Sequence, residues 1–154
     1  MKRALVLGLT IIALSSIGIS QTTNNGVGRE NQEGQVAPPS VAINPHGVDF
    51  KDQVAKKASK PQRVTVTNNG GKELYINSAV VEGDNKEDFV ISNDTCTGST
   101  ISANKSCVID IVFTPAASER RKATLTITDN AVDSPQRVTL TGNGINSVDV
   151  PPRR

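Results

Sequence analysis

Apolar and polar residues alternate along most of the chain between residues 40 and 144. Six segments show this period of two: 63–67, 73–77, 89–91, 107–113, 123–128 and 137–141. Around Leu125, for example, Ala123 and Ile127 share one side of the segment and threonines take the other side. Because successive side chains of a strand point to opposite faces, this alternation predicts strands with one buried and one exposed face.

Turn-forming residues separate these segments. The Asn-Asn-Gly-Gly run at 68–71 predicts a hairpin between the strand around Val64 and the strand around Leu74. Further turn signals fall at 83–85, 93–94, 114–115 and 129–130. We therefore expect about seven or eight short strands, which is typical of a single all-β domain, an immunoglobulin-like antiparallel β-sandwich over residues 40–144.

The start of the chain has the three parts of a secretory signal peptide. A basic beginning, an apolar run from Ala4 to Leu14 and small residues up to Ser20 follow one another. The apolar stretch is shorter than the roughly 20 residues that a membrane-spanning helix needs. We expect residues 1–20 to be cleaved off as a signal peptide rather than kept as an anchor. The mature protein is then periplasmic or secreted, without stable membrane insertion.

The segments on both sides of the predicted domain are expected to be flexible. Residues 21–39 contain no Leu, Ile, Phe or Tyr and are expected to form a disordered linker. Residues 145–154 include two prolines and two arginines and are expected to form a flexible tail. Loss of the signal peptide also removes Lys2 and Arg3, so the 17 basic residues become 15, equal to the 15 acidic ones. A net charge of zero gives no reason to expect nucleic-acid binding.

The two cysteines, Cys96 and Cys107, allow a single disulfide. An exported protein reaches an oxidising compartment, where an even number of cysteines favours pairing. The bridge would close a loop between the strand around Phe89 and the strand around Ile109. A metal site is not expected, because neither cysteine has a nearby His or a third thiol. The absence of Trp also separates this chain from antibody-type domains, whose disulfide packs on a buried Trp.

The residues that could carry catalysis are few. The single His, His46, lies in an Asn-Pro-His-Gly segment that is typical of a turn, and with both cysteines paired it has no evident nucleophile partner. No short motif of hydrolases, zinc proteases or nucleotide-binding proteins occurs. We therefore expect no enzyme activity, no catalytic residues and no cofactor.

Two loops are rich in carboxylates and could offer oxygen ligands to Ca²⁺. One contains Asp84, Glu87 and Asp88, and the other is the loop 129–134 with Asp129, Asn130 and Asp133. Neither matches a complete calcium motif, and Asp and Asn also favour turns for their own hydrogen bonds. Calcium binding by the loop 129–134 stays open at this point.

The order of several motifs resembles a known family. The segments are INPHGVDF, PQRVTVTNNGGKELYINSAVV, DFVISNDTC, ISANKSCVIDIVFTP and RKATLTITDNAVDSPQRVTLTGNG. Together they resemble the Hydin-like (ASH-type) immunoglobulin-like domains, and most closely the bacterial choice-of-anchor D proteins, over residues 40–144. The most specific parts are Cys-Val-Ile at 107–109 leading into Val-Phe-Thr-Pro at 112–115, and Ser-Pro-Gln at 134–136 leading into Leu-Thr-Gly at 140–142.

The resemblance implies an immunoglobulin-like fold similar to major sperm protein and the pilus chaperones, with no common catalytic residues. The chain departs from the family at Lys51, where members usually have Gly after the Phe that matches Phe50. It also has one copy of a domain that is often repeated and surface-anchored.

These observations favour an exported, non-enzymatic interaction or scaffold module that binds a protein or cell-envelope partner. Edge strands of a sandwich carry unpaired backbone groups that a partner strand can join. The alternatives are a periplasmic chaperone-like protein, by fold analogy, and, less favoured, a small hydrolase.

Overall fold

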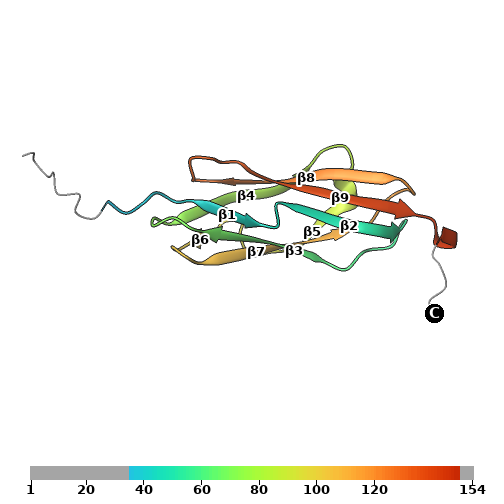
Figure 1. Cartoon of the computed structure of the whole chain (residues 1–154), viewed down its shortest axis with the longest axis horizontal. Helices are drawn as coiled ribbons and strands as arrows, with labels where there is room; N and C mark the ends of the chain where they lie inside the picture. Colours follow the sequence, from blue (N-terminus) through green and yellow to red (C-terminus); the bar gives the residue numbers. More distant parts are fainter. Residues whose placement is uncertain (1–34, 150–154) are drawn as a thin grey trace, which may run out of the picture. The chain divides into compact units, whose positions relative to one another are not determined.

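The computed structural model describes residues 35–149, which form two sheets that pack as a sandwich (Figure 1). The four-stranded sheet has the order β1 (Val41–Asn44), β3 (Gln62–Asn68), β7 (Ser106–Phe113), β5 (Phe89–Asp94). The five-stranded sheet has the order β2 (Gly47–Val54), β9 (Gln136–Ile145), β8 (Arg120–Asp129), β4 (Leu74–Glu82), β6 (Thr100–Ile101). Two short 3-10 helices, η1 (Lys86–Asp88) and η2 (Ser147–Asp149), complete the described part of the chain.

The predicted all-β sandwich is therefore confirmed. The described residues form nine strands, slightly more than expected, because β6 has only 2 residues and the first strand is divided into β1 and β2. Each segment of alternating pattern lies in a strand, apart from Glu73 just before β4, and its alternating apolar side chains are buried or, at Ile91, partly buried. Leu125 of β8 is fully buried, as its pattern predicts. The largest fully buried side chains are Phe113, Leu74, Ile76, Ile109, Ile111, Leu125, Ile127 and Leu140.

One side of the sandwich is closed because the chain changes sheets there. β1 pairs antiparallel with β3, and after Pro45 and His46 the chain continues as β2, which pairs parallel with β9. The first strand therefore supplies an edge to both sheets on this side. Within the described residues, this parallel pairing contrasts with the antiparallel pairing of every other neighbouring pair of strands.

The hairpin predicted at residues 68–71 is wrong, because β3 and β4 belong to different sheets. Asn68 is fully buried, and its side-chain Nδ2 donates to the carbonyls of Lys72 (2.8 Å) and Ile101 (2.9 Å). These bonds turn the chain across the sandwich rather than back along the same sheet. Gly70 is required here, since a Cβ at this position would lie 2.1 Å from the carbonyl oxygen of Pro38.

Backbone hydrogen bonds also involve residues on either side of the expected domain, residues 40–144. The carbonyl of Ala37 accepts hydrogen bonds from the N–H groups of Gly71 (3.1 Å) and Lys72 (2.8 Å). Ile145 ends β9, and its carbonyl accepts from the N–H of Ala55 at 2.9 Å. The expected signal peptide (1–20), the linker up to residue 34 and the last five residues of the expected tail, 150–154, lie outside the described residues. Within residues 35–149, no helix combines the length and the apolar character that a membrane crossing needs.

Candidate functional site

The single histidine lies at the bend between β1 and β2, with an exposed imidazole. The carbonyl of His46 accepts a hydrogen bond from the N–H of Thr139 at 3.2 Å, which ties the bend to β9. This agrees with its interpretation as a turn residue.

The carboxylates of the first acidic loop do not gather into a site. Asp88 is buried and accepts a hydrogen bond from Arg121, whereas Asp84 and Glu87 remain exposed. Among residues 35–149, no group of three or more His, Cys, Asp or Glu side chains is arranged to hold a metal ion.

The second acidic loop is organised around a buried carboxylate. Asp129 accepts a hydrogen bond from the N–H of Ala131 (2.8 Å), and its own N–H donates to the hydroxyl of Ser134 (2.9 Å). Burial raises the pKa of Asp129 above its usual value, against the hydrogen bond from Ala131, and the negative charge of Asp133 adds to the rise. These contacts are those of a closed turn between β8 and β9.

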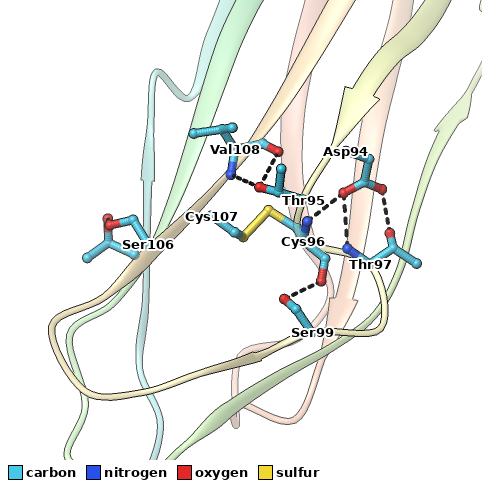
Figure 2. Close-up of a disulfide and its surroundings, with 9 residues drawn as sticks. Asp94, Thr95, Cys96, Thr97, Ser99, Ser106, Cys107 and Val108 are labelled. Carbon is cyan, nitrogen blue, oxygen red and sulfur yellow. Dashed lines mark hydrogen bonds between the residues drawn. A yellow bond between two sulfur atoms is a disulfide. The ribbon is translucent and has the colours of Figure 1, made fainter.

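Cys96 and Cys107 form the disulfide that the sequence indicated (Figure 2). Their Cα atoms are 5.1 Å apart, and both side chains are buried. Cys107 lies in β7 of the four-stranded sheet, and Cys96 lies in the loop that leads from β5 to β6 of the other sheet. The bridge therefore fixes the point at which the chain leaves the end of β5.

Asp94, the last residue of β5, positions Cys96 for this bridge. Its carboxylate accepts hydrogen bonds from the N–H of Cys96 (2.7 Å), the N–H of Thr97 (3.0 Å) and the hydroxyl of Thr97 (2.6 Å), as Figure 2 shows. Burial alone would raise the pKa of Asp94, but the hydrogen bonds from Thr97 and Cys96 outweigh it and hold the pKa below its usual value. The loop after β5 is thus held by a carboxylate as well as by the disulfide.

The start of β5 is fixed by an ion pair. Nε of Arg121 in β8 lies 2.5 Å from Oδ2 of Asp88, and the side chains are 13% and 6% exposed. The other carboxylate oxygen of Asp88 accepts from the N–H of Ala116 at 3.3 Å. Both ends of β5 are therefore anchored, one by this ion pair and the other by the disulfide.

The side of the sandwich opposite β1 and β2 is open. β5 is the last strand of the four-stranded sheet, and β6 pairs only with Leu74 and Tyr75 of β4. From Ser78 to Glu82, β4 therefore pairs with β8 on one side and has no described strand partner on its other side. The two sheets thus end here in two unpaired strand edges, one from β4 and one from β5.

A groove of about 310 Å³ lies between these two edges. Val81 of β4 and Phe89 and Ile91 of β5 give it an apolar lining, and Lys86 and Glu87 of η1 line it as well. Val90, which is 55% exposed, also lines the groove, and Val80, next to Val81 in β4, is 45% exposed. Exposed apolar side chains on unpaired edges are characteristic of surfaces that meet another molecule.

The hydrogen-bond register shows which backbone groups of β5 are free to meet a partner. Phe113 lies opposite Phe89 but bonds to Ser59 rather than to β5. Its N–H donates to the hydroxyl of Ser59 (3.0 Å), and its C=O accepts from the N–H of Ser59 (2.8 Å). Bonded and non-bonded pairs alternate along an antiparallel ladder. The C=O of Phe89 and the N–H and C=O of Ile91 therefore point away from β7, toward the open edge, whereas the N–H of Phe89 donates to the carbonyl of Lys86 in η1.

The edges on the opposite side are better protected. β1 has only 4 residues and is bounded by Pro39 and Pro45, and proline discourages strand addition. β2 has a register shift between Asp49 and Asp52, with Lys51 at the irregularity. Bulges and lysines are the usual protection of an edge. β5 has a shift as well, between Ile91 and Asn93, so its regular edge is residues 89–91.

Sequence reasoning had named edge strands as binding elements without identifying which strands these are. The alternating pattern indicates that β4 and β5 are strands, but it contains no information on sheet order. The pairs Val80-Val81 and Val90-Ile91, where both parities are apolar, are the signal that could have pointed to them.

Comparison with known families gives one match across the domain. Residues 39–144 match the family model described as HYDIN/CFA65/VesB-like, Ig-like domain. No curated protein matches the chain in sequence.

Solved structures with the same fold come from several kinds of protein. A protein of unknown function from Porphyromonas gingivalis W83 has a TM-score of 0.57 at 12% identity, and the match covers 70% of this chain and 48% of that one. The secreted serine protease VesC from Vibrio cholerae has a TM-score of 0.52 at 19% identity, over 71% of this chain and 23% of the protease. The ASH / PapD-like domain of human CEP192 has a TM-score of 0.51 at 13% identity, over 70% of this chain and 86% of that domain. At such identities the likeness shows the fold alone, and this chain spans less than half of the first two proteins.

Proposed function

The chain belongs to the HYDIN/CFA65/VesB-like family of Ig-like domains, and on this premise we propose that it is an exported, non-enzymatic module that binds a protein of the cell envelope. The observation that carries the proposal is the open side of the sandwich between β4 and β5. The C=O of Phe89 and the N–H and C=O of Ile91, which face away from β7, border a groove there that four apolar residues and two charged residues line. Unpaired edges of this kind bind partners by accepting an additional strand.

Export is supported by three features. A buried disulfide between Cys96 and Cys107 suits an oxidising compartment. The first residues of the chain have the pattern of a signal peptide. VesC, which shares the fold, is named as a secreted protein. We also propose that the chain is most similar to the choice-of-anchor D proteins within this family. The proposed module has no nucleic-acid partner and no stable insertion in the membrane.

A binding role is favoured over a catalytic one because the groove and the titratable side chains of the described residues do not coincide in a catalytic arrangement. The residues that line the groove are apolar apart from Lys86 and Glu87, which lie beside each other at 3.9 Å. His46 is not among the lining residues. A periplasmic chaperone-like role would use the same open side for transient binding, and the PapD-like fold of the CEP192 domain is its support.

Affinity capture tests the proposal. Tagged protein comprising residues 21–154 is incubated with the cell-envelope fraction of the source organism, and bound proteins are identified by mass spectrometry. Wild type and Ile91→Val should capture the same partner, since Val keeps the free N–H and most of the apolar surface. Ile91→Pro removes that N–H without removing a bond to β7, so it should fold and capture at least about fivefold less.

His46→Ala serves as a control outside the groove and should capture as well as wild type. Equal capture by Ile91→Pro, with an unchanged thermal unfolding curve, would contradict the proposal. Capture that depends on His46 would instead make the bend between β1 and β2 the site.

A further inference from the structure

We propose that two copies of this chain associate through the open edge of β4, with residues 78–82 of one copy paired antiparallel to residues 78–82 of the other. The pairing joins the two five-stranded sheets into one continuous sheet. It needs no partner of another kind, and it therefore goes beyond the proposed binding of a cell-envelope protein.

The pairing of β4 with β8 decides which backbone groups of β4 face this edge. Lys122 of β8 donates its N–H to Oδ1 of Asn85 (2.9 Å), and its C=O accepts from the N–H of Asn85 (3.2 Å). Because Asn85 lies just beyond the end of β4, the backbone groups of Lys122 point toward β4 and away from β9. Residues two apart in a strand direct these groups to the same edge. The residues of β8 that bond to β4 are therefore 124, 126 and 128, which lie opposite Glu82, Val80 and Ser78.

Ala79 and Val81 alternate with the three bonded residues of β4, so their N–H and C=O groups point toward the open side. Within residues 35–149, none of these four groups takes part in a hydrogen bond. A strand edge with free donors and acceptors at this spacing is a template for another strand.

The free groups of this edge are complementary to those of a second copy. With Val80 opposite Val80 of the second copy on a two-fold axis, Ala79 lies opposite Val81 of that copy, and Val81 lies opposite its Ala79. Two residues that face each other in a hydrogen-bonded pair of an antiparallel ladder exchange two backbone bonds. The two pairs would thus form four hydrogen bonds and satisfy all the free groups at positions 79 and 81. A symmetric contact of this kind is the commonest among oligomers.

The free part of the edge is as long as this pairing needs. In the described chain, β6 pairs with the first two residues of β4, and the N–H of Ile76 donates to the carbonyl of Ser99 at 3.1 Å. A pairing centred on Val80 overlaps only residues 78–82 of the two copies. The residues that β6 and its loop cover therefore lie outside the overlap.

The side chains of the edge are apolar where the two copies would meet. Val80 is 45% exposed on the outer face of the sheet. On the axis it would lie against Val80 of the second copy in a non-hydrogen-bonded pair, in which the Cα atoms are about 4.5 Å apart. Ala79 and Val81 are partly buried and pack against the core of their own copy, and each would cover the other across the axis. Association therefore removes apolar surface from water.

Charges do not oppose the pairing. Glu82 is the single charged residue from position 78 to position 82, and it would lie opposite Ser78 of the second copy. Within its own copy, Glu82 accepts a hydrogen bond from the hydroxyl of Thr126 (2.8 Å) and lies 3.9 Å from Nη1 of Arg137. Like charges, which are unfavourable when directly opposite, therefore do not face each other across the axis.

The β4 edge is less protected than the other edges of the sandwich. Residues 78–82 contain no Pro and no Lys, and their register with β8 has no shift. On β5 the regular edge is limited to residues 89–91, and the N–H of Phe89 is already bonded to Lys86. Because an unprotected edge tends to pair with another chain, β4 is the edge that a second copy would join.

A cysteine on the axis tests the proposed register. In Val80→Cys, the introduced side chain lies opposite its counterpart, at a Cα separation that a disulfide can bridge. Mild oxidation should link this variant into a covalent dimer through position 80, with the bridge between Cys96 and Cys107 intact in a peptide map. Ser78→Cys is the matched control. Its counterpart lies four residues further along the paired strands, about 14 Å away, so this variant should not be linked.

Sedimentation equilibrium tests the association itself. Protein comprising residues 21–154 should change from monomer to dimer between about 10 µM and about 500 µM. Ala79→Pro removes an N–H of the open edge without removing a bond to β8, and each dimer loses two bonds. It should dimerise at least about tenfold more weakly, whereas Ala79→Ser keeps the N–H and should stay within about twofold of wild type.

Val80→Lys gives a second test that does not place a proline in β4. The change is at an exposed side chain and brings two like charges together on the axis, so this variant should remain a monomer at low salt over the same concentrations. A wild-type monomer at every concentration, or equal linking of Ser78→Cys and Val80→Cys, would overturn the inference. A dimer that persists in both Ala79→Pro and Val80→Lys would show that the copies meet elsewhere. Capture of a cell-envelope protein through Ile91 would still support the proposed function in each of these cases.

Discussion

Arg121 of β8 and Asp88 of η1 form a nearly buried ion pair that joins the connection before β5 to the five-stranded sheet. The two residues are 33 positions apart, and Arg121 also contacts Glu119. Both look like surface charges in the sequence, since each stands in a segment rich in charged residues. Their pairing explains why the acidic loop predicted around residues 84–88 does not form a cluster of three free carboxylates.

Removal of Arg121 is expected to destabilise the domain strongly. Arg121→Met leaves the charge of Asp88 buried without its partner, which should cost about 3–5 kcal/mol of unfolding free energy. Asp88→Asn/Arg121→Met should cost less than the single change, because no buried charge is left. Urea unfolding of the wild type, both single variants and the double variant checks this as a double-mutant cycle. Additive effects would show that the two side chains do not depend on each other.

The disulfide should add stability without being the sole support of the fold. In the chain-entropy model, closing a loop of this length stabilises by roughly 3 kcal/mol. Cys96→Ser/Cys107→Ser should therefore unfold at a lower denaturant concentration while remaining folded in water. Peptide mapping of the mature protein under non-reducing conditions checks the bridge itself. Two free thiols in that map would show that the protein does not carry this bridge in its native compartment.

The alternating pattern predicted the sandwich because half of each strand is buried. Ile109 and Leu125 could be assigned to the core from their parity alone, and both are fully buried. Parity cannot show which strands are neighbours. The Asn-Asn-Gly-Gly run identified a turn but not its destination, which depends on bonds from the buried side chain of Asn68 to Lys72 and Ile101.

The open side escaped prediction for the same reason. Whether β4 and β5 are edges depends on sheet order, which results from the packing of the whole domain. The two hydrogen bonds that the carbonyl of Ala37 accepts could not be predicted either, because backbone bonds leave no trace in composition. The disulfide, in contrast, followed from residue type and spacing, since two cysteines allow one pairing.

Truncation of a core side chain tests the strand parity. Leu125→Ala should cost about 2–5 kcal/mol through lost burial and the cavity that remains. His46→Ala changes an exposed bend residue and should alter the unfolding free energy by less than about 0.5 kcal/mol. Thermal and urea unfolding of both variants gives the comparison. An unchanged stability of Leu125→Ala would mean that this position does not face the core.

Lys51 takes a backbone conformation that glycine favours. Its φ is 58°, and the carboxylate of Asp49 accepts hydrogen bonds from its N–H (3.0 Å) and from its Nζ (2.7 Å). Glycine adopts such a φ at the least cost, because it has no Cβ. The hydrogen bonds from Lys51 hold the pKa of Asp49 below its usual value.

Lys51→Gly should stabilise the domain by about 1 kcal/mol, because glycine adopts positive φ without the cost that a side chain brings. Loss of the exposed ion pair with Asp49 reduces this gain only slightly. Lys57→Gly is the control, since Lys57 is not among the residues of positive φ in the described chain, and it should be neutral or destabilising. If both changes destabilise equally, the conformation of Lys51 carries no strain.

Acid should weaken the loop that carries Cys96, because the carboxylate of Asp94 is bonded in its ionised form. The pKa of Asp94 in the folded protein lies below the usual 3.8, despite a burial effect that acts in the opposite direction. A group whose folded pKa is lowered stabilises the fold above its unfolded pKa and loses that contribution as the pH falls through the folded value.

Asp94→Asn should therefore lower the unfolding free energy most near neutral pH, by about 1 kcal/mol, since the amide keeps an acceptor for the N–H groups but not the charge. The difference from wild type should shrink as the pH falls below 3.8, where the wild-type carboxylate also becomes neutral. Urea unfolding at a series of pH values measures this difference. Asp84→Asn, at an exposed carboxylate outside this loop, should show a smaller difference with little dependence on pH. A difference in unfolding free energy between wild type and Asp94→Asn that stays constant from neutral to acidic pH would show that the charge of Asp94 does not stabilise the loop after β5.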